Sequence, residues 1–137
     1  MKKILTVIVA IVMLSSFVGI SAQAATVDPG ITPLWDNTAS LTVGIYFLED
    51  GDAFAEVYTA GKFGATKITS QVKVYEQYGA FWVQIAQAEQ TTYGNADVLT
   101  CYFTPVVGEN YKAVFTVTVT KDNTDETITK TYYRTYE

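Results

Sequence analysis

The feature that most constrains this chain is the strict alternation of apolar and polar residues in short segments. In residues 40–47, Leu41, Val43, Ile45 and Phe47 alternate with polar or small residues. Successive side chains of a β-strand point to opposite faces, so a period of two predicts strands with one buried face. Such segments recur roughly every 10 to 16 residues, with turn residues between them. The predicted strands cover residues 40–47, 53–59, 66–75, 80–86, 98–103, 111–119 and 126–136.

Seven short strands without a helical segment predict an all-β fold, a two-sheet antiparallel sandwich of immunoglobulin-like type. Within the fourth segment, the alternation assigns Phe81, Val83 and Ile85 to the core and Trp82 and Gln84 to the solvent.

The lone cysteine of the chain is predicted to be a core residue. Cys101 alternates in register with Leu99 and Phe103, on the apolar side of its strand. A single cysteine excludes an internal disulfide, so packing must supply the stability. Bacterial lipid attachment needs a cysteine directly after the leader, where this chain has Ala25.

The sixth predicted strand begins at Tyr111, three residues after Gly108. This pattern resembles the corner of immunoglobulin-like folds in which a tyrosine hydroxyl bonds to a preceding loop. The alternative is a tyrosine that merely starts a strand.

The N-terminus has the pattern of an export signal. Lys2 and Lys3 precede a mostly apolar stretch, and the small residues Ala22 and Ala24 suit a signal peptidase, so we expect cleavage after Ala24. An uncleaved membrane anchor is the alternative, but the strongly apolar part has about 15 residues, short of the roughly 20 that span a bilayer. The expected protein is secreted, with a signal peptide over residues 1–24, an N-terminal arm over 25–39 and the sandwich domain over 40–137.

Charge and composition exclude several functional classes. Without Lys2 and Lys3 the chain has 7 basic and 14 acidic residues, a net charge of −7 that disfavours nucleic acids and anionic membranes as partners. The sequence contains no histidine, which excludes the usual serine and cysteine nucleophile sites and imidazole-based metal sites. The single cysteine excludes thiolate clusters, so no metal ion is expected. No phosphate-binding glycine loop or dinucleotide fingerprint is present, so no cofactor is expected.

The start of the predicted arm reads Ile-Thr-Pro-Leu-Trp-Asp-Asn over residues 31–37, and Gly61-Lys62 and Thr66-Lys67-Ile68 follow an alanine-rich strand. This arrangement resembles small secreted β-sandwich proteins of Gram-positive bacteria, which begin with Ile-x-Pro-x-Trp-x-Asn. The resemblance covers most of the predicted mature chain, although Leu34 stands where a basic residue is common. It implies a β-sandwich and assigns no catalytic or binding residue.

Aromatic residues supply the candidate ligand-binding positions. Tyr75, Tyr78 and Trp82 lie on one predicted hairpin, with Gln84 nearby. Flat rings beside amide groups suit a sugar, because rings stack on C–H faces while amides bond hydroxyls. The alternative is that these rings only cover the sheet and contribute cross-strand packing. Trp35 is expected to anchor the arm at one end of the sandwich rather than contact a ligand.

Acidic residues gather in two predicted turns, at residues 49–52 and 122–126. Aspartate favours tight turns, so a purely structural role is expected. Calcium binding by these loops is an alternative, although neither has the spacing of a known calcium motif. Two carboxylates of a small hydrolase are a further alternative.

The sequence therefore predicts a secreted, non-enzymatic binding or structural domain at or near the bacterial cell surface. Its expected partner is a cell-wall polysaccharide or a surface protein. A carbohydrate-binding module with an exposed aromatic face is the main alternative.

Overall fold

The computed structural model describes residues 34–137; the predicted signal peptide and most of the predicted arm lie outside them. The described part forms seven strands and no helix. Within residues 34–137 there is accordingly no helix that could cross a membrane.

The strands follow the predicted segments and extend most of them by a few residues. Their bounds are β1 Thr38–Phe47, β2 Ala53–Gly61, β3 Ala65–Tyr78, β4 Phe81–Thr92, β5 Ala96–Phe103, β6 Asn110–Lys121 and β7 Thr124–Thr135.

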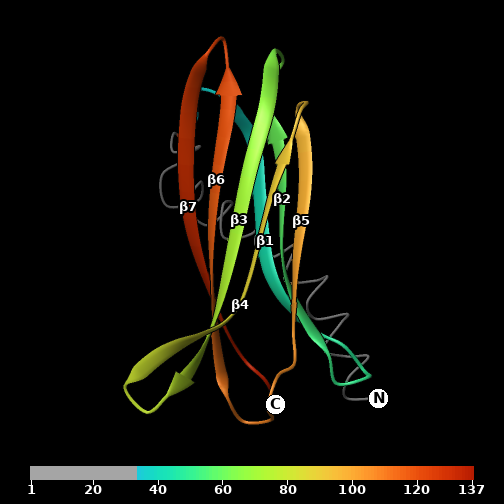
Figure 1. Cartoon of the computed structure of the whole chain (residues 1–137), viewed down its shortest axis with the longest axis vertical. Coiled ribbons are helices and arrows are strands. Elements are labelled where there is room, and N and C mark those ends of the chain that lie inside the picture. The colour runs from blue at the N-terminus through green and yellow to red at the C-terminus, as the bar shows by residue number, and fades with distance from the viewer. Residues whose placement is uncertain (1–33) are drawn as a thin grey trace, which may run out of the picture.

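Two antiparallel sheets face each other in Figure 1, one with the order β1-β2-β5 and one with the order β4-β3-β6-β7. The chain changes sheet after β2, β4 and β5, and only β1–β2, β3–β4 and β6–β7 are hairpins. This is the connectivity of an immunoglobulin-like sandwich, so the predicted fold class is confirmed.

The core lies between the sheets and is built from the apolar faces that the alternation predicted. Val57 of β2, Val72 of β3 and Phe115 of β6 are fully buried. Cys101 is also a core residue, as predicted, and burial raises the pKa of its thiol. The small residues Ala53 and Ala55 of β2 are fully buried in the same core. At one end of the core, Phe47 contacts Phe103, Tyr111 and Tyr136 at centroid distances of 6.5, 6.0 and 4.6 Å.

The prediction for the core face of β4 is wrong. Phe81 is 76 %, Val83 47 % and Ile85 38 % exposed. A bulge accounts for Ile85: Val74 pairs with Ala86, whereas the next residue of β3 pairs with Gln84, so Ile85 is left without a partner.

On the core side of the bulge, Ala86 and Ala88 pack against the core in place of the predicted residues. Beyond it, Val83 and Phe81 do point to the inner side, opposite Glu76 and Tyr78. However, this end of the β3–β4 hairpin extends away from the three-stranded sheet, as the lower left of Figure 1 shows, so no facing strand covers it.

The tyrosine corner is present. Tyr111 is fully buried, and its hydroxyl accepts a hydrogen bond of 2.6 Å from the amide of Val106 in the preceding loop. The same hydroxyl donates to Oε1 of Glu76 over 2.8 Å. Burial is the main reason that the pKa of Tyr111 is raised to about 12, with the hydrogen bond to Glu76 acting in the same direction.

Trp35 anchors the described part of the arm. It is partly buried against the core, its carbonyl accepts a hydrogen bond from Nζ of Lys62, and Nζ of Lys130 lies 5.7 Å from its ring. These contacts agree with the anchoring role that the sequence predicted.

Candidate ligand-binding site

The outer face of the four-stranded sheet carries a group of aromatic and amide side chains at the end of the β3–β4 hairpin. Cross-strand pairing aligns Gln84, Tyr75, Lys112 and Tyr133 in one row across all four strands. The neighbouring row, nearer the end of the hairpin, contains Trp82, Gln77, Asn110 and Thr135. Residues distant in sequence therefore form one surface.

The aromatic rings of this surface surround a lysine. Trp82 and Tyr133 meet edge to face, with centroids 5.8 Å apart and planes at 61°. Nζ of Lys112 lies 4.9 Å from the Trp82 ring and 4.7 Å from the Tyr75 ring. Such contacts hold rings at fixed positions because the cation is attracted to the electron-rich ring faces.

A chain of hydrogen bonds fixes the polar groups beside the rings. The hydroxyl of Thr135 donates to Oδ1 of Asn110 over 2.5 Å, and Nδ2 of Asn110 donates to Oε1 of Gln77 over 2.9 Å. Nε2 of Gln77 in turn donates to the carbonyl of Gly79 over 3.2 Å. Both amides thus have a defined orientation, with donors and acceptors left over for a ligand.

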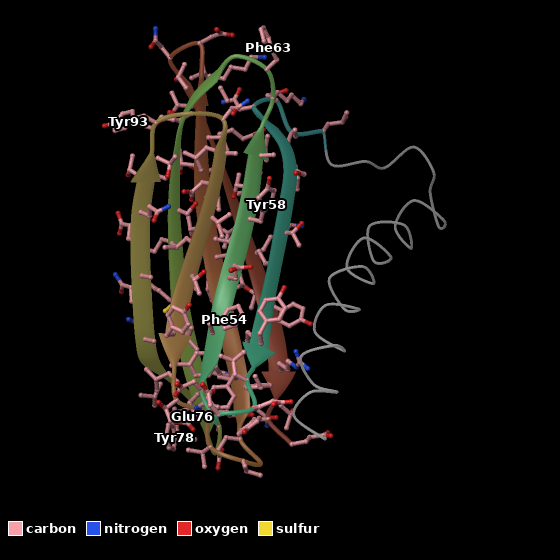
Figure 2. All side chains as sticks on the ribbon, turned by 90° about the vertical axis from the view of Figure 1, so that its right-hand side faces the viewer. Phe54, Tyr58, Phe63, Glu76, Tyr78 and Tyr93 are labelled. Atoms are coloured by element: carbon pink, nitrogen blue, oxygen red, sulfur yellow. The ribbon has the colours of Figure 1, made fainter. Side chains whose placement is uncertain are left out.

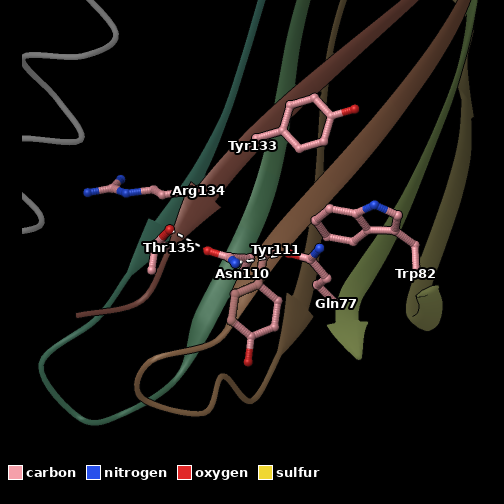
Figure 3. A pocket seen from close by; sticks show the side chains of 7 residues that line it. All are labelled: Gln77, Trp82, Asn110, Tyr111, Tyr133, Arg134 and Thr135. Atoms are coloured by element: carbon pink, nitrogen blue, oxygen red, sulfur yellow. Dashed lines mark hydrogen bonds between the residues drawn. The ribbon is translucent and has the colours of Figure 1, made fainter. Parts of the chain in front are cut away.

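Rings and amides together form a pocket of about 280 Å³, shown in Figure 3. This volume is at the lower limit of the roughly 300–1,000 Å³ of pockets for drug-sized ligands, so it suits a single small ring rather than a whole oligomer. The pocket is lined by Gln77, Trp82, Asn110, Tyr111, Tyr133, Arg134 and Thr135.

The four predicted ligand-binding residues do not all lie together. Tyr75, Trp82 and Gln84 share the outer face, and Trp82 lines the pocket directly. Tyr78 points to the opposite side of the hairpin, where its hydroxyl donates to Oε2 of Glu76. That hydrogen bond is the main cause of a raised pKa of Tyr78. Tyr78 is therefore not part of the pocket.

Sequence reasoning missed the contributions of β6 and β7. Asn110, Tyr133 and Thr135 line the pocket only because these strands pair beside β3 in the observed register. The alternation of residues in β7 could have placed Tyr133 on the exposed face of its strand. Nothing in the local sequence indicates that Tyr133 lies near Trp82.

Structural roles account for the acidic turns. The amide of Asp52 donates to Oδ1 of Asp50 over 3.0 Å, which closes the first turn. Asp122 and Asn123 have φ values of 52° and 58° and form the two-residue hairpin turn between β6 and β7. Among residues 34–137, no three histidine, cysteine or acidic residues cluster closely enough to hold a metal ion.

Glu126 fastens the arm to the sandwich. Its carboxylate accepts hydrogen bonds from the amides of Asp36, Asn37 and Thr38 over 2.6, 3.1 and 3.0 Å, and from the Thr38 hydroxyl over 2.7 Å. Partial burial by itself would raise the pKa of Glu126, but these hydrogen bonds favour the charged form and lower it below the ordinary 4.5. The carboxylate of Glu126 thus has a structural role, holding residues 36–38 against β7.

We expect Glu126→Gln to lower the free energy of unfolding by about 1 kcal/mol at pH 7, because an amide cannot accept four hydrogen bonds. The depressed pKa means that the unfolded chain binds the proton more readily, so the stabilisation is present above pH 4.5 and lost as the pH falls through the folded-state value. Urea unfolding at several pH values should show the difference between parent and variant shrinking in acid. A difference in unfolding free energy between parent and variant that stays constant with pH would contradict this role. The same would follow if the exposed control Glu89→Gln showed an equal dependence on pH.

Comparison with known proteins finds no matching family model and no matching curated protein. Among solved structures, a β-glucuronidase from Parabacteroides merdae is similar, with a TM-score of 0.43 and 16 % identity over 69 % of this chain. A glycosyl hydrolase family 2 member from Bacteroides cellulosilyticus has a TM-score of 0.40 and 12 % identity over 67 % of this chain. The matches span only 13 % and 15 % of those two chains.

Proposed function

We propose that this protein is an exported, non-enzymatic binding domain of the bacterial surface, and that the pocket between Trp82 and Tyr133 binds a sugar unit of a cell-wall polysaccharide. The observation that carries the proposal is the aromatic pair standing beside a chain of oriented amide and hydroxyl groups.

The chemistry of the pocket matches a pyranose ring. Its C–H faces are apolar and stack on aromatic rings, while its hydroxyls need paired donors and acceptors. Trp82 and Tyr133 provide the aromatic rings for stacking. The hydrogen-bond donors and acceptors come from Gln77, Asn110 and Thr135. Because hydrogen bonds and packing already hold these groups, little ordering entropy is lost when a ligand binds.

The pocket favours binding over hydrolysis. Glycoside hydrolysis requires two carboxyl groups across the bond that is cleaved. The described residues that line the pocket include no aspartate or glutamate. Glu76, a buried acid bonded to Tyr111 of the pocket lining, also accepts a hydrogen bond from Tyr78. The signal-peptide pattern of residues 1–24 and a net charge unsuited to nucleic acids support a role outside the cell.

Association with a surface protein is the second candidate, and the inner side of the β3–β4 hairpin favours it. Tyr78, Phe81 and Val83 are exposed there on adjacent strands. Contiguous exposed apolar residues mark interaction sites in many proteins. This surface faces away from the pocket, so variants can separate the two functions.

We expect the purified protein to be retained on peptidoglycan or insoluble polysaccharide, and Trp82→Ala to weaken this binding at least tenfold. Tenfold corresponds to about 1.4 kcal/mol, the scale of one lost stacking contact. Tyr133→Ala should weaken it similarly. Tyr93→Ala is the matched control, because Tyr93 is highly exposed in the β4–β5 connection and lies outside the pocket.

Retention of Trp82→Ala equal to that of the parent would exclude the pocket as the sugar site. Loss of retention in Phe81→Ser but not in Trp82→Ala would instead indicate that the polysaccharide binds to the inner side of the hairpin. Urea unfolding of each variant establishes that the sandwich is intact.

A further inference from the structure

The outer face of the other sheet carries a second group of aromatic residues, which Figure 2 views from the front with Phe54 and Tyr58 labelled. Tyr46, Phe54 and Tyr102 form one row across β1, β2 and β5, with centroids 4.9 and 5.8 Å apart. Two residues further along β2 from Phe54 is Glu56, and two further again is Tyr58. The carboxylate of Glu56 therefore lies between this aromatic row and the ring of Tyr58.

A hollow lies beside this carboxylate because β1 has a glycine there. Gly44 pairs with Glu56, and a Cβ at Gly44 would lie 2.7 Å from the hydroxyl oxygen of Tyr46, which leans over it. The hollow has a volume of about 170 Å³ and is lined by Thr42, Tyr46, Glu56 and Tyr58. Tyr46 is 7 % exposed and forms the closed side, whereas Tyr58 is 46 % exposed and forms the open side.

No basic residue neutralises Glu56 from its own sheet. One oxygen, Oε2, accepts a hydrogen bond of 2.9 Å from the Thr100 hydroxyl. Strands β1, β2 and β5 contain no lysine or arginine. Arg134 approaches from β7, but its guanidinium donates to the carbonyl of Ile45 over 2.7 Å and lies 5.2 Å from the Phe47 ring, on the core side of β1.

The negative field of Glu56 is felt within the hollow. The pKa of Tyr46 is raised to about 12, first by burial, then by the charge of Glu56 and by Tyr132, while the charge of Arg134 lowers it by less. The net effect disfavours a second negative charge in the hollow. A positive charge would be favoured by the same carboxylate.

We propose that this hollow binds an organic cation, an ammonium or guanidinium group, with Glu56 as its counter-charge and the Tyr46 and Tyr58 rings as its walls. Rings attract cations through their electron-rich faces, and one carboxylate adds direct charge complementarity. A calcium ion does not fit, because it takes six to eight oxygen ligands and the hollow offers one carboxylate and few hydroxyls. The site lies on the opposite sheet from the sugar pocket and is independent of it.

The test is an NMR titration of the ¹⁵N-labelled protein with choline, with the methylamide of N-acetyl-lysine, and with the uncharged carbon analogue of choline. We expect both cations to shift the amide signals of Gly44, Glu56 and Tyr58 in a saturable way. The uncharged analogue should bind at least tenfold more weakly. The tighter of the two cations identifies a small quaternary amine or a protein side chain as the source of the ligand.

Two variants localise the effect. Glu56→Gln keeps the shape and the contact with Thr100 but removes the charge, and should weaken cation binding at least tenfold. Gly44→Ala keeps every polar group but pushes the Tyr46 ring into the hollow, and should also abolish saturable shifts. Glu89→Gln, an acid of β4 on the other sheet, is the matched control and should bind as the parent does.

Equal affinity for choline and its uncharged analogue would overturn the proposal, as would unchanged binding by Glu56→Gln. Absence of any shift in the parent would do the same. None of these results bears on retention by polysaccharide, which Trp82 governs in the proposed function.

Discussion

Replacement of Asp97 by alanine is expected to lower the free energy of unfolding by about 3 kcal/mol. Asp97 is a buried residue of β5, and its carboxylate joins the two sheets. Oδ2 accepts a hydrogen bond from the Ser70 hydroxyl over 2.6 Å, and Oδ1 accepts from Nε2 of Gln90 over 2.6 Å and from the Thr92 hydroxyl over 2.5 Å. Alanine leaves three donors without this acceptor, and the Ser70 hydroxyl is fully buried.

Urea unfolding followed by tryptophan fluorescence measures the effect, with an unchanged slope showing that the unfolded state is the same. Asp97→Asn keeps an acceptor oxygen and should lose less than Asp97→Ala. The exposed Glu89→Ala should change stability by under about 0.5 kcal/mol. A loss of less than about 1 kcal/mol for Asp97→Ala would show that water replaces the missing acceptor.

Asp97 also illustrates what alternation can and cannot predict. Because side chains point to alternate faces, the period of two located all seven strands and most of the core, including Val72, Phe115 and Val117. Asp97 lies one residue before the predicted strand 98–103, so the same rule assigned it no face and could not say which hydroxyls and amides would reach it. Its partners come from β3 and β4, and the contact between sheets depends on tertiary packing.

The error in β4 has two causes. A bulge adds one residue to one strand of a pair, so Ile85 has no partner and the inward positions continue with Ala86 and Ala88 instead. The sequence around Ile85 contains no glycine or proline that would signal this. Val83, in contrast, does lie on the inner side, and it is exposed because this end of the hairpin extends beyond the facing sheet (Figure 1).

The candidate site was partly predictable. Trp82 and Gln84 were correctly placed on the outer face, and the parity of positions 75 and 78 already implies that Tyr78 lies on the opposite face from Tyr75. What alternation could not supply was the pairing of β3 with β6 and of β6 with β7, which brings Asn110 and Tyr133 to the pocket. The pairing of strands that are distant in the sequence depends on the whole fold. The pocket could therefore not be predicted from any one segment.

Replacement of Tyr111 by phenylalanine is expected to lower the free energy of unfolding by about 2–3 kcal/mol, because it removes one hydroxyl that bonds both to the amide of Val106 and to the buried carboxylate of Glu76. The amide of Val106 loses its acceptor, and the carboxylate of Glu76, itself buried, loses one of its donors. Phenylalanine fills the same space, so no cavity contributes. The ring contact with Phe103, at 5.1 Å, is retained.

Tyr78→Phe is the matched control for this prediction, because Tyr78 donates to the other oxygen of the same carboxylate but is 54 % exposed. Water can replace an exposed donor, so this variant should lose less than about 1 kcal/mol in the same urea experiment. If the two variants lose equal stability, the corner to Val106 contributes nothing beyond the bond to Glu76. If instead the double variant loses more than the sum of the two, Glu76 needs at least one tyrosine to remain buried, since an unpaired carboxylate in the core is costly.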